Sequence, residues 1–375
     1  MDRAFAELTP PAPWVSDQDD TLQCVQVRQE THDVKTFVLA TARASSYRYL
    51  PGQFITLELQ IDGQPVNRCY TLSSTPTRPD RLSITVKRVP GGLVSNWLHD
   101  NLRPGSTLGA RGPGGDFSCF LRPATRYLFL SGGSGITPLM SMARALHDLA
   151  SDVDVVFVHC ARTPADILFA EELALLARNM PRFRVAVICE WQPQGSPYAG
   201  HLGRIDGTRL AHIAPDYLER DVYTCGPAPF MGAVRSLLED AGYDMARYRQ
   251  ESFTFETLAP AITVADVSAL VGAQAEAEVT GDAATTAVQQ FQITFPKLGK
   301  TFSCRSDQPI LQAATAAGLR LPFSCSSGIC GTCKSKKISG AVEIKHAGGI
   351  RQREIDQGWV LPCCSYPQSD VTLDR

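Results

Sequence analysis

The sequence predicts a multidomain protein with an antiparallel all-β domain, a parallel α/β domain and a small α+β domain. From residue 22 to about 120, short β-rich runs are separated by turns. From residue 126, strand-like runs alternate with amphipathic helical stretches. From residue 291, a strand-like and a helix-like segment precede a cluster of cysteines. We place the domains at 1–123, 124–257 and 290–375, with a linker at 258–289.

The composition is that of an ordinary globular protein. The chain has 375 residues, 44% of them hydrophobic and 20% charged, which is enough for two or three cores. Its net charge of −2 gives no broad basic field, so we expect neither nucleic acid nor a membrane as a partner. The first residues lack a secretory signal pattern, and no run approaches the ~20 apolar residues of a membrane span. We therefore expect a cytoplasmic protein.

The first domain consists of short strands. The runs 36–40, 54–61 and 81–89 are rich in β-branched and aromatic residues and are separated by turns. This pattern is typical of an antiparallel barrel or sandwich.

One strand of this domain, "NRCYTLSS" at 67–74, combines an arginine with a tyrosine. Alternate side chains of a strand share a face, so Arg68 and Tyr70 project together. Arginine can bind a pyrophosphate with two hydrogen bonds, and a tyrosine can cover a flat ring. Downstream, a Gly-rich turn leads into a helix near Leu93, and a helix N-terminus is a ready anion site. Alone, each motif is equally compatible with an ordinary strand, turn and helix start.

The second domain contains a strand at 126–132, the Gly-rich turn "GGSG" at 132–135 and a helix from about Pro138. This order suits a pyrophosphate at the helix N-terminus, although it is not the G-x-G-x-x-G fingerprint. Strand-like 153–160 and 183–190 flank a helix-like stretch at 164–180. A second motif, "YTCGPAPFM", places Cys225 at a strand end, where packing is the simplest explanation.

Between the second and third domains, residues 256–290 contain no aromatic residue, lysine or arginine. This stretch is too poor in large side chains to form a core, which supports the linker at 258–289.

Twelve cysteines occur in the chain, and three of them are regularly spaced. Cys325, Cys330 and Cys333 form C-x4-C-x2-C, and either Cys363 or Cys364 can complete a set of four. One distant cysteine after that spacing is the plant-type arrangement for a [2Fe-2S] cluster. Structural zinc is the alternative, although zinc sites more often show paired short knuckles. Six cysteines lack ligand-like spacing, and we expect them to be small buried hydrophobes: Cys24, Cys69, Cys119, Cys160, Cys189 and Cys304.

Residues 291–375 resemble plant-type ferredoxins, which implies a β-grasp fold and favours Cys363 over Cys364 as the fourth ligand. The preceding domains resemble the ferredoxin-NADP reductase superfamily, whose pattern is Arg-x-Tyr-Ser or Thr followed by Gly-x-x-Ser. That resemblance implies a β-barrel that binds flavin, FAD rather than FMN, and an α/β domain that binds a nicotinamide nucleotide. It also implies an approach of the 251–253 segment to the flavin.

The resemblance implies particular roles for residues of both domains. The residues expected at the reacting rings are Tyr70, Thr71, Ser73 and Cys225. The residues expected to bind cofactors are Arg68, Cys69, Tyr70, Thr71, Val86, Gly91, Gly92, Leu93, Val94, Ser95, Gly132, Gly133, Gly135, Ile136, Thr137, Arg162, Cys225, Gly226, Pro227 and Phe253.

The choice of nucleotide depends on the residues after the strand 153–160. No carboxylate for a ribose hydroxyl follows at once, and Arg162 could accept a 2′-phosphate. Related oxygenase reductases with this "RTPADI" type of sequence chiefly use NADH. We therefore expect NADH, with NADPH as the alternative.

The domain order resembles the reductase components of Rieske-type oxygenases. It implies electron flow from NADH to flavin, cluster and an external oxygenase. Within that group, the stretches "ITVKRVPGGLVSNWLHDNL", "MSMAR", "ICGTCK" and "LPCC" resemble reductases whose oxygenases demethylate quaternary ammonium compounds such as glycine betaine, which implies a partner of that kind. A reductase of hybrid-cluster protein or of another acceptor is one alternative, and a zinc-stabilised interaction protein without redox activity is another.

From Phe291 onward, eleven basic and six acidic residues give a net charge of 11 − 6 = +5. Lys334, Lys336 and Lys337 could therefore steer the domain toward an acidic patch on the partner.

Overall fold

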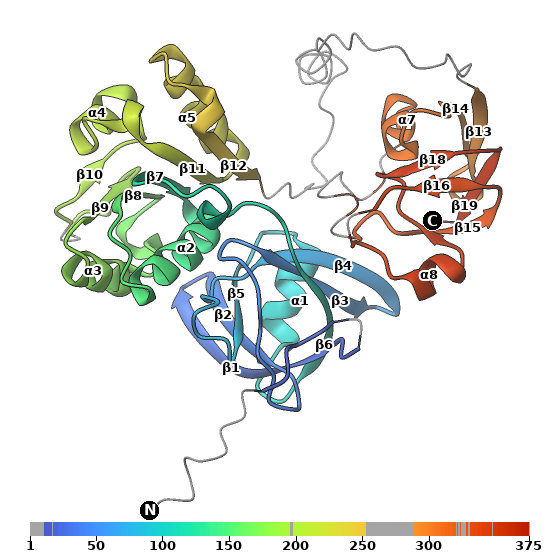
Figure 1. The fold of residues 1–375 in the computed structure, drawn as a ribbon, viewed down its shortest axis with the longest axis horizontal. Coiled ribbons are helices and arrows are strands. Elements are labelled where there is room, and N and C mark those ends of the chain that lie inside the picture. Colours follow the sequence, from blue (N-terminus) through green and yellow to red (C-terminus); the bar gives the residue numbers. More distant parts are fainter. Residues whose placement is uncertain are drawn as a thin grey trace, which may run out of the picture. The chain divides into compact units, whose positions relative to one another are not determined.

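The computed structural model describes residues 11–16, 18–195, 198–252, 289–319, 321, 323, 328, 331–346 and 348–374. The expected linker at 258–289 lies outside these residues. The chain divides into two compact units, the first containing the barrel and the α/β domain and the second the C-terminal domain (Figure 1).

The first domain is an antiparallel barrel with strand order β4-β3-β6-β1-β2-β5. An isolated bridge between Leu72 and Ile84 brings the end of β4 to β5 and so joins the two outer strands. The helix α1 (Leu93–Asn101) packs Val94 and Leu98 into the barrel core. The strands are β1 (Thr21–Thr31), β2 (Val34–Ala40), β3 (Phe54–Ile61), β4 (Gln64–Thr71), β5 (Leu82–Lys87) and β6 (Thr107–Gly114).

The second domain is a parallel six-stranded sheet with order β10-β9-β8-β7-β11-β12. Successive strands run outward from β7 through β8 and β9, and the chain then returns to the other side of β7 at β11. Ligands bind at such a switch point, outside the carboxyl ends of the strands. The strands are β7 (Arg126–Gly132), β8 (Asp154–Ala161), β9 (Phe183–Cys189), β10 (His201–Leu202), β11 (Asp221–Gly226) and β12 (Tyr248–Ser252).

The helices of this domain are α2 (Ile136–Asp148), α3 (Ala170–Asn179), α4 (Gly207–Ile213) and α5 (Ala228–Asp240). The helix predicted across 164–180 is wrong at its start, because α3 begins only at Ala170. Before it, Pro164–Asp166 form a single 3₁₀ turn, in which Asp166 accepts from the Thr163 amide at 3.0 Å. Phe169 then adopts φ = 54°, in the left-handed region, which interrupts the helix.

The C-terminal domain is an α+β fold with a five-stranded sheet of order β14-β13-β19-β15-β17 and a separate pair, β16 and β18. The parallel pairing of β13 with β19 brings the two ends of the domain together, and α7 packs Ile310 and Leu311 into its core. The elements are β13 (Gln290–Phe295), β14 (Lys300–Arg305), α7 (Ile310–Ala316), β15 (Ser335–Ser339), β16 (Val342–Ile344), α8 (Gln352–Asp356), β17 (Trp359–Val360), β18 (Ser365–Pro367) and β19 (Val371–Asp374).

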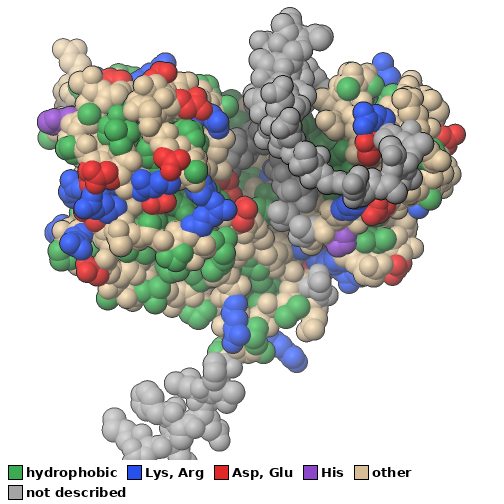
Figure 2. All heavy atoms as spheres, turned by 45° about the horizontal axis from the view of Figure 1, so that its top comes forward, with side chains coloured by type: hydrophobic (Ala, Val, Ile, Leu, Met, Phe, Trp, Pro, Cys, Tyr) green, Lys and Arg blue, Asp and Glu red, His purple; other side chains and the backbone are tan. Residues whose placement is uncertain are grey.

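Charged side chains of both signs are interspersed on the face drawn in Figure 2. Of the helices among the described residues, none has the length and apolar character needed to cross a bilayer.

A fully buried arginine ties together the starts of three strands in the α/β sheet. Arg220, whose side chain is 0% exposed, precedes β11 and donates to both carboxylate oxygens of Asp216 at 2.8 Å. It also donates to Asp154 Oδ1 of β8 at 2.7 Å and to the Tyr127 carbonyl of β7 at 3.2 Å. The charge is therefore paired, and its hydrogen-bonding capacity is used.

We expect Arg220→Met to destabilise the α/β domain by about 3 kcal/mol, because Asp216 and Asp154 lose their buried cation and, among the described residues, keep only the more distant, exposed Arg126 and Arg184. Arg182→Met removes an exposed pair with Asp152 and is the control, with an expected loss of at most about 1 kcal/mol. The loss of stability in each variant is measured by hydrogen exchange of the β7, β8 and β11 peptides across a denaturant series. Equal denaturant midpoints for Arg220→Met and Arg182→Met would contradict the stabilising role of Arg220.

Candidate functional site

The strand β4 presents the arginine and tyrosine of the first motif. Arg68 lies opposite Leu57 of β3 and Tyr70 opposite Ile55, so the two side chains share one face as predicted. Tyr70 is buried, and burial raises the pKa of its hydroxyl. Arg68 is half-buried at the same face of the barrel.

Ser73 lies beyond the end of β4, not within the strand as the sequence suggested. It is fully buried, and its hydroxyl lies 2.9 Å from Thr85 Oγ1 and donates to the Ser83 carbonyl at 3.2 Å. Thr85 in turn bonds Thr36 at 2.8 Å. The structure thus places Ser73 in a buried hydroxyl chain that anchors the segment after β4 inside the barrel.

The Gly-rich turn before α1 leaves a helix N-terminus open. Gly91 has φ = +70°, a conformation that favours glycine. No side chain caps the first turn of α1, and Ser95 Oγ instead accepts from the Val89 amide at 3.2 Å. Leu93 is exposed, while Val94 and the β5 residue Val86 are buried in the barrel core. The uncapped amide groups suit an anionic group such as a phosphate.

The Gly-rich loop after β7 meets the end of β11. In the sheet register, Ser131 lies between His159 of β8 and Cys225 of β11. A Cβ at Gly135 would lie 2.4 Å from the Cys225 carbonyl oxygen, so only glycine allows this approach. No side chain caps α2, whose first residues Ile136 and Thr137 are buried. Gly132 and Gly133 complete the loop, so its backbone can contact a pyrophosphate.

The flavin motif and the nucleotide motif converge at a single carboxylate. Glu251 of β12 is paired with Cys225, and Thr71 at the end of β4 donates to Glu251 Oε2 at 3.3 Å. Cys225 is fully buried, and burial raises the pKa of its thiol well above the usual value. Burial also raises the pKa of Glu251 to about 8. Gly226 and Pro227 follow at the strand end, whereas Phe253 lies outside the described residues.

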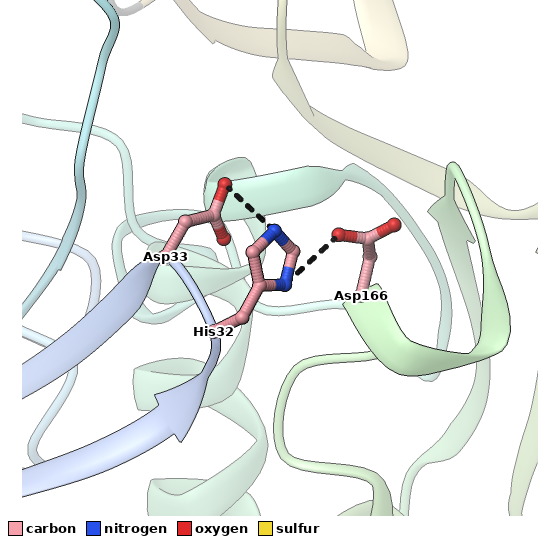
Figure 3. A group of neighbouring side chains, drawn as sticks. All are labelled: His32, Asp33 and Asp166. Carbon is pink, nitrogen blue, oxygen red and sulfur yellow. Dashed lines mark ion pairs between the residues drawn. The ribbon is translucent and has the colours of Figure 1, made fainter.

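The structure places Arg162 in a group of ionic side chains. Its guanidinium lies 3.7 Å from Asp33 Oδ2 and 3.9 Å from Asp166 Oδ1. Figure 3 shows His32 between the same two carboxylates, at 3.8 and 3.9 Å. The three side chains of Figure 3 are close enough to surround a cation, but Lys87 Nζ already lies 3.2 Å from Asp33. We therefore interpret the group as an ion-pair cluster that joins the β1–β2 turn to the segment after β8.

A carboxylate that the sequence reasoning missed lies beside the end of β8. The Glu190 amide, directly after β9, donates to the Ala161 carbonyl at 3.0 Å, so Glu190 continues the parallel pairing of the two strands. Its carboxylate is exposed and lies 3.4 Å from Arg204. The sequence contains the signal for this residue, because carboxyl ends of neighbouring parallel strands share one sheet edge and Glu190 follows β9 as Arg162 follows β8.

Two of the four expected cluster ligands are described by the structure. Cys333 and Cys363 are buried in the core of the C-terminal domain, whereas Cys325 and Cys330 lie outside the described residues. Cys364 is equally buried, and its sulfur lies 2.6 Å from the position that a Cβ on Gly328 would take. Gly328 has φ = +71°. Cys364 therefore packs against the loop backbone. The thiols present suit a thiolate-ligated iron cluster.

The cysteines without ligand-like spacing mostly lie in cores. Cys24, Cys119, Cys189 and Cys304 are buried, and Cys69 and Cys160 are partly buried. Cys69 Sγ lies 3.4 Å from Thr56 Oγ1 across β3 and β4.

Comparison with known families matches all three domains. Residues 21–119 match the oxidoreductase FAD-binding domain, 129–236 the oxidoreductase NAD-binding domain, and 294–368 the 2Fe-2S iron-sulfur cluster binding domain. The last match sets aside the zinc alternative.

Curated relatives match along nearly the whole chain. The glycine betaine monooxygenase reductase subunit of Pseudomonas aeruginosa is 46% identical, over 94% of each chain. The stachydrine N-demethylase reductase subunit of Rhizobium meliloti is 40% identical, over 95% of this chain and 96% of its own. Among solved structures, the FAD/NAD-binding domain of nitric oxide dioxygenase from Vibrio cholerae matches 62% of this chain and 98% of its own, with a TM-score of 0.56 and 28% identity.

Glu251 gives the stability of the first unit a distinct pH dependence. Its carboxyl binds a proton more tightly in the folded state, with a pKa of about 8, than in the unfolded state, where the pKa is about 4.3. Between these values the folded state holds the extra proton, so stability falls as pH rises and levels off above pH 8. We expect the thermal midpoint of the flavin-free wild-type protein to fall as pH rises toward 8, and Glu251→Gln to abolish this fall. Parallel profiles of thermal midpoint against pH for the wild type and Glu251→Gln would refute the role of Glu251.

Proposed function

Because this chain belongs to the ferredoxin-NADP reductase superfamily, in the group that carries a C-terminal [2Fe-2S] domain, we propose that it supplies electrons to a Rieske-type oxygenase that demethylates glycine betaine or a related quaternary ammonium compound. The names of the relatives at 46% and 40% identity support this substrate class. The chain itself is an NADH-dependent flavoprotein reductase that uses FAD and a [2Fe-2S] cluster.

The structural observation that supports the reductase reaction is the meeting of β4, β11 and β12 at Thr71, Cys225 and Glu251. It brings the end of the flavin strand to the end of the nucleotide-binding sheet. When bound, FAD takes two electrons together from NADH and gives them up one at a time, which matches a one-electron cluster. The protein's task is to hold the two rings in contact and to keep water away from them.

Individual residues divide this task. Arg68 would fork onto the FAD pyrophosphate, and the open amide groups of α1 after Gly92 would bind the same anion. Tyr70 would cover the ring. The Thr71 hydroxyl holds Glu251 in place, and the raised pKa of Glu251 lets this carboxyl hold a proton near neutral pH beside the buried Cys225.

NADH is the donor that the sheet edge suits. Arg162 lies near two carboxylates, Asp33 and Asp166, so its charge is already balanced in part. Glu190 offers an acceptor for a ribose 2′-hydroxyl and would repel a 2′-phosphate.

The three lysines that follow Cys333 have different surroundings in the structure. Lys334 donates to Glu354, and both side chains are only 15% exposed. Lys336 donates to the Gln357 carbonyl and lies 5.4 Å from the Trp359 ring centroid. Only Lys334 of these three is paired with a carboxylate in the described residues, so we retain a steering role toward an acidic patch on the oxygenase for Lys336 and Lys337.

Replacing either member of the adjacent cysteine pair tests the path of the electrons. Cys363→Ser removes a proposed thiolate ligand. We expect NADH to reduce the flavin at the wild-type rate, while formaldehyde release by the partner oxygenase with glycine betaine falls at least about 100-fold. Cys364→Ser is the matched control and should retain both iron and delivery. If Cys364→Ser loses the cluster and Cys363→Ser keeps it, the assignment of Cys363 as the fourth ligand is wrong. If the wild-type reductase and its oxygenase do not demethylate glycine betaine or its relatives, the substrate proposal is wrong.

Substituting Glu190 tests the choice of nucleotide. Glu190→Gln removes the repulsion of a 2′-phosphate and one acceptor for the 2′-hydroxyl. We expect the ratio of kcat/KM for NADH over NADPH to fall about tenfold, the effect of roughly 1.4 kcal/mol. Glu239→Gln, an exposed carboxylate paired with Arg235 on α5, serves as the control. An unchanged ratio in Glu190→Gln would remove this residue from nucleotide recognition.

A further inference from the structure

One face of α2 is bonded to the segment that follows the flavin strand. Ser141, Arg144 and Asp148 are spaced by three and four residues, so their side chains lie along one side of the helix. Ser141 Oγ donates to the Ser74 carbonyl at 2.5 Å, and Arg144 Nη1 donates to the Ser73 carbonyl. The helix therefore contacts two consecutive carbonyl groups just beyond β4.

The end of the helix makes the third contact with this segment. Thr77 Oγ1 donates to Asp148 Oδ2 at 2.6 Å. Arg78 donates to both Asp148 oxygens, at 2.7 and 2.9 Å. These bonds are at the surface, so the more buried hydrogen bonds from Ser141 and Arg144 constrain the segment more strongly.

Arg144 is fixed from both sides. It is 7% exposed, and its Nε and Nη2 donate to the two carboxylate oxygens of Glu172 in α3 at 2.7 and 2.5 Å. Its guanidinium carbon lies 4.9 Å from the Phe169 ring centroid. Burial opposes the charge on Glu172, but the hydrogen bonds from Arg144 outweigh it and lower the pKa of this carboxyl. The bidentate pair therefore holds the guanidinium plane in one orientation.

The barrel side of the contact is equally rigid. Ser73 is anchored through the buried hydroxyl chain to Thr85 and Thr36. Beside the contact lies a cavity of about 700 Å³, bordered by Ser74 and Arg78 of the barrel and by Arg144, Phe169 and Glu172. Because side-chain packing does not fill this side of the junction, the polar contacts maintain its geometry.

We propose that Arg144, with Ser141, is a positioning residue that sets the nucleotide loop of α2 against the flavin strand. This inference rests on the proposed function. The loop Gly132–Gly135 immediately precedes α2, about 12 Å along the helix from Arg144, while Ser73 is two residues from Thr71. One guanidinium thus connects the elements that carry the two cofactors. In the reaction, the C4–H bond of NADH breaks and an N–H bond of FAD forms, with both electrons moving with the hydrogen. Its rate depends steeply on that geometry.

Arg144→Met tests the proposal, with Ser141→Ala as a milder variant that removes one hydrogen bond. We expect anaerobic stopped-flow reduction of the FAD-loaded protein by NADH to show a limiting rate lowered about 10- to 100-fold in Arg144→Met, and less in Ser141→Ala. The dissociation constant for NADH should stay within about twofold of wild type, because the loop itself is intact. Arg235→Met, which removes an Arg–Glu pair within α5, is the control and should change neither quantity.

Hydrogen exchange of the same proteins gives a readout that does not depend on turnover. We expect faster amide exchange in 73–78 and α2 of Arg144→Met, with β8 and β9 unchanged. Wild-type limiting rates in both variants, or unchanged exchange in 73–78 and α2, would overturn the proposal. If Arg144→Met does not fold, the rate and exchange of Ser141→Ala decide. A wild-type protein that NADH fails to reduce would instead refute the proposed function, and hydrogen exchange would still test the contact.

Discussion

The contact between nicotinamide and flavin is the constraint on which the rest of the first unit depends. Two rings from two domains must meet with an error well below 1 Å, and neither domain can achieve this alone. We propose that the two rings meet at the carboxyl edge of the parallel sheet. There Thr71 of the barrel bonds Glu251, and Glu251 is paired with Cys225. The chain thus couples a rigid barrel to a sheet whose switch point faces it.

Much of this arrangement is predictable from local sequence. Alternation in β4 places Arg68 and Tyr70 on one face, and the order strand, Gly-rich turn, helix at 126–148 predicts the nucleotide loop. These features depend on near neighbours, whose geometry is fixed by the periodicity of strands and helices. The cysteine spacing is equally local, which is why the cluster type could be predicted from residues 325–363.

Features set by contacts between distant segments could not be predicted in the same way. Ser73 falls in a strand-like run, yet the closure of the barrel at Leu72 and Ile84 draws it into the core. Glu190 gains its place only from the parallel pairing of β9 with β8, and Arg162 is balanced by a carboxylate about 130 residues earlier in the chain. The late start of α3 follows from the left-handed Phe169, for which the apolar pattern gives no signal.

The central claim is that electrons from NADH reach the C-terminal cluster through FAD. Anaerobic stopped-flow mixing of the purified protein with NADH, followed at flavin and iron-sulfur wavelengths, tests it most directly. The account predicts about one FAD and two iron atoms per chain, loss of the flavin band, and then loss of the cluster band at a rate independent of protein concentration. A cluster that stays oxidised after the flavin is fully reduced, or a protein without iron, would contradict it.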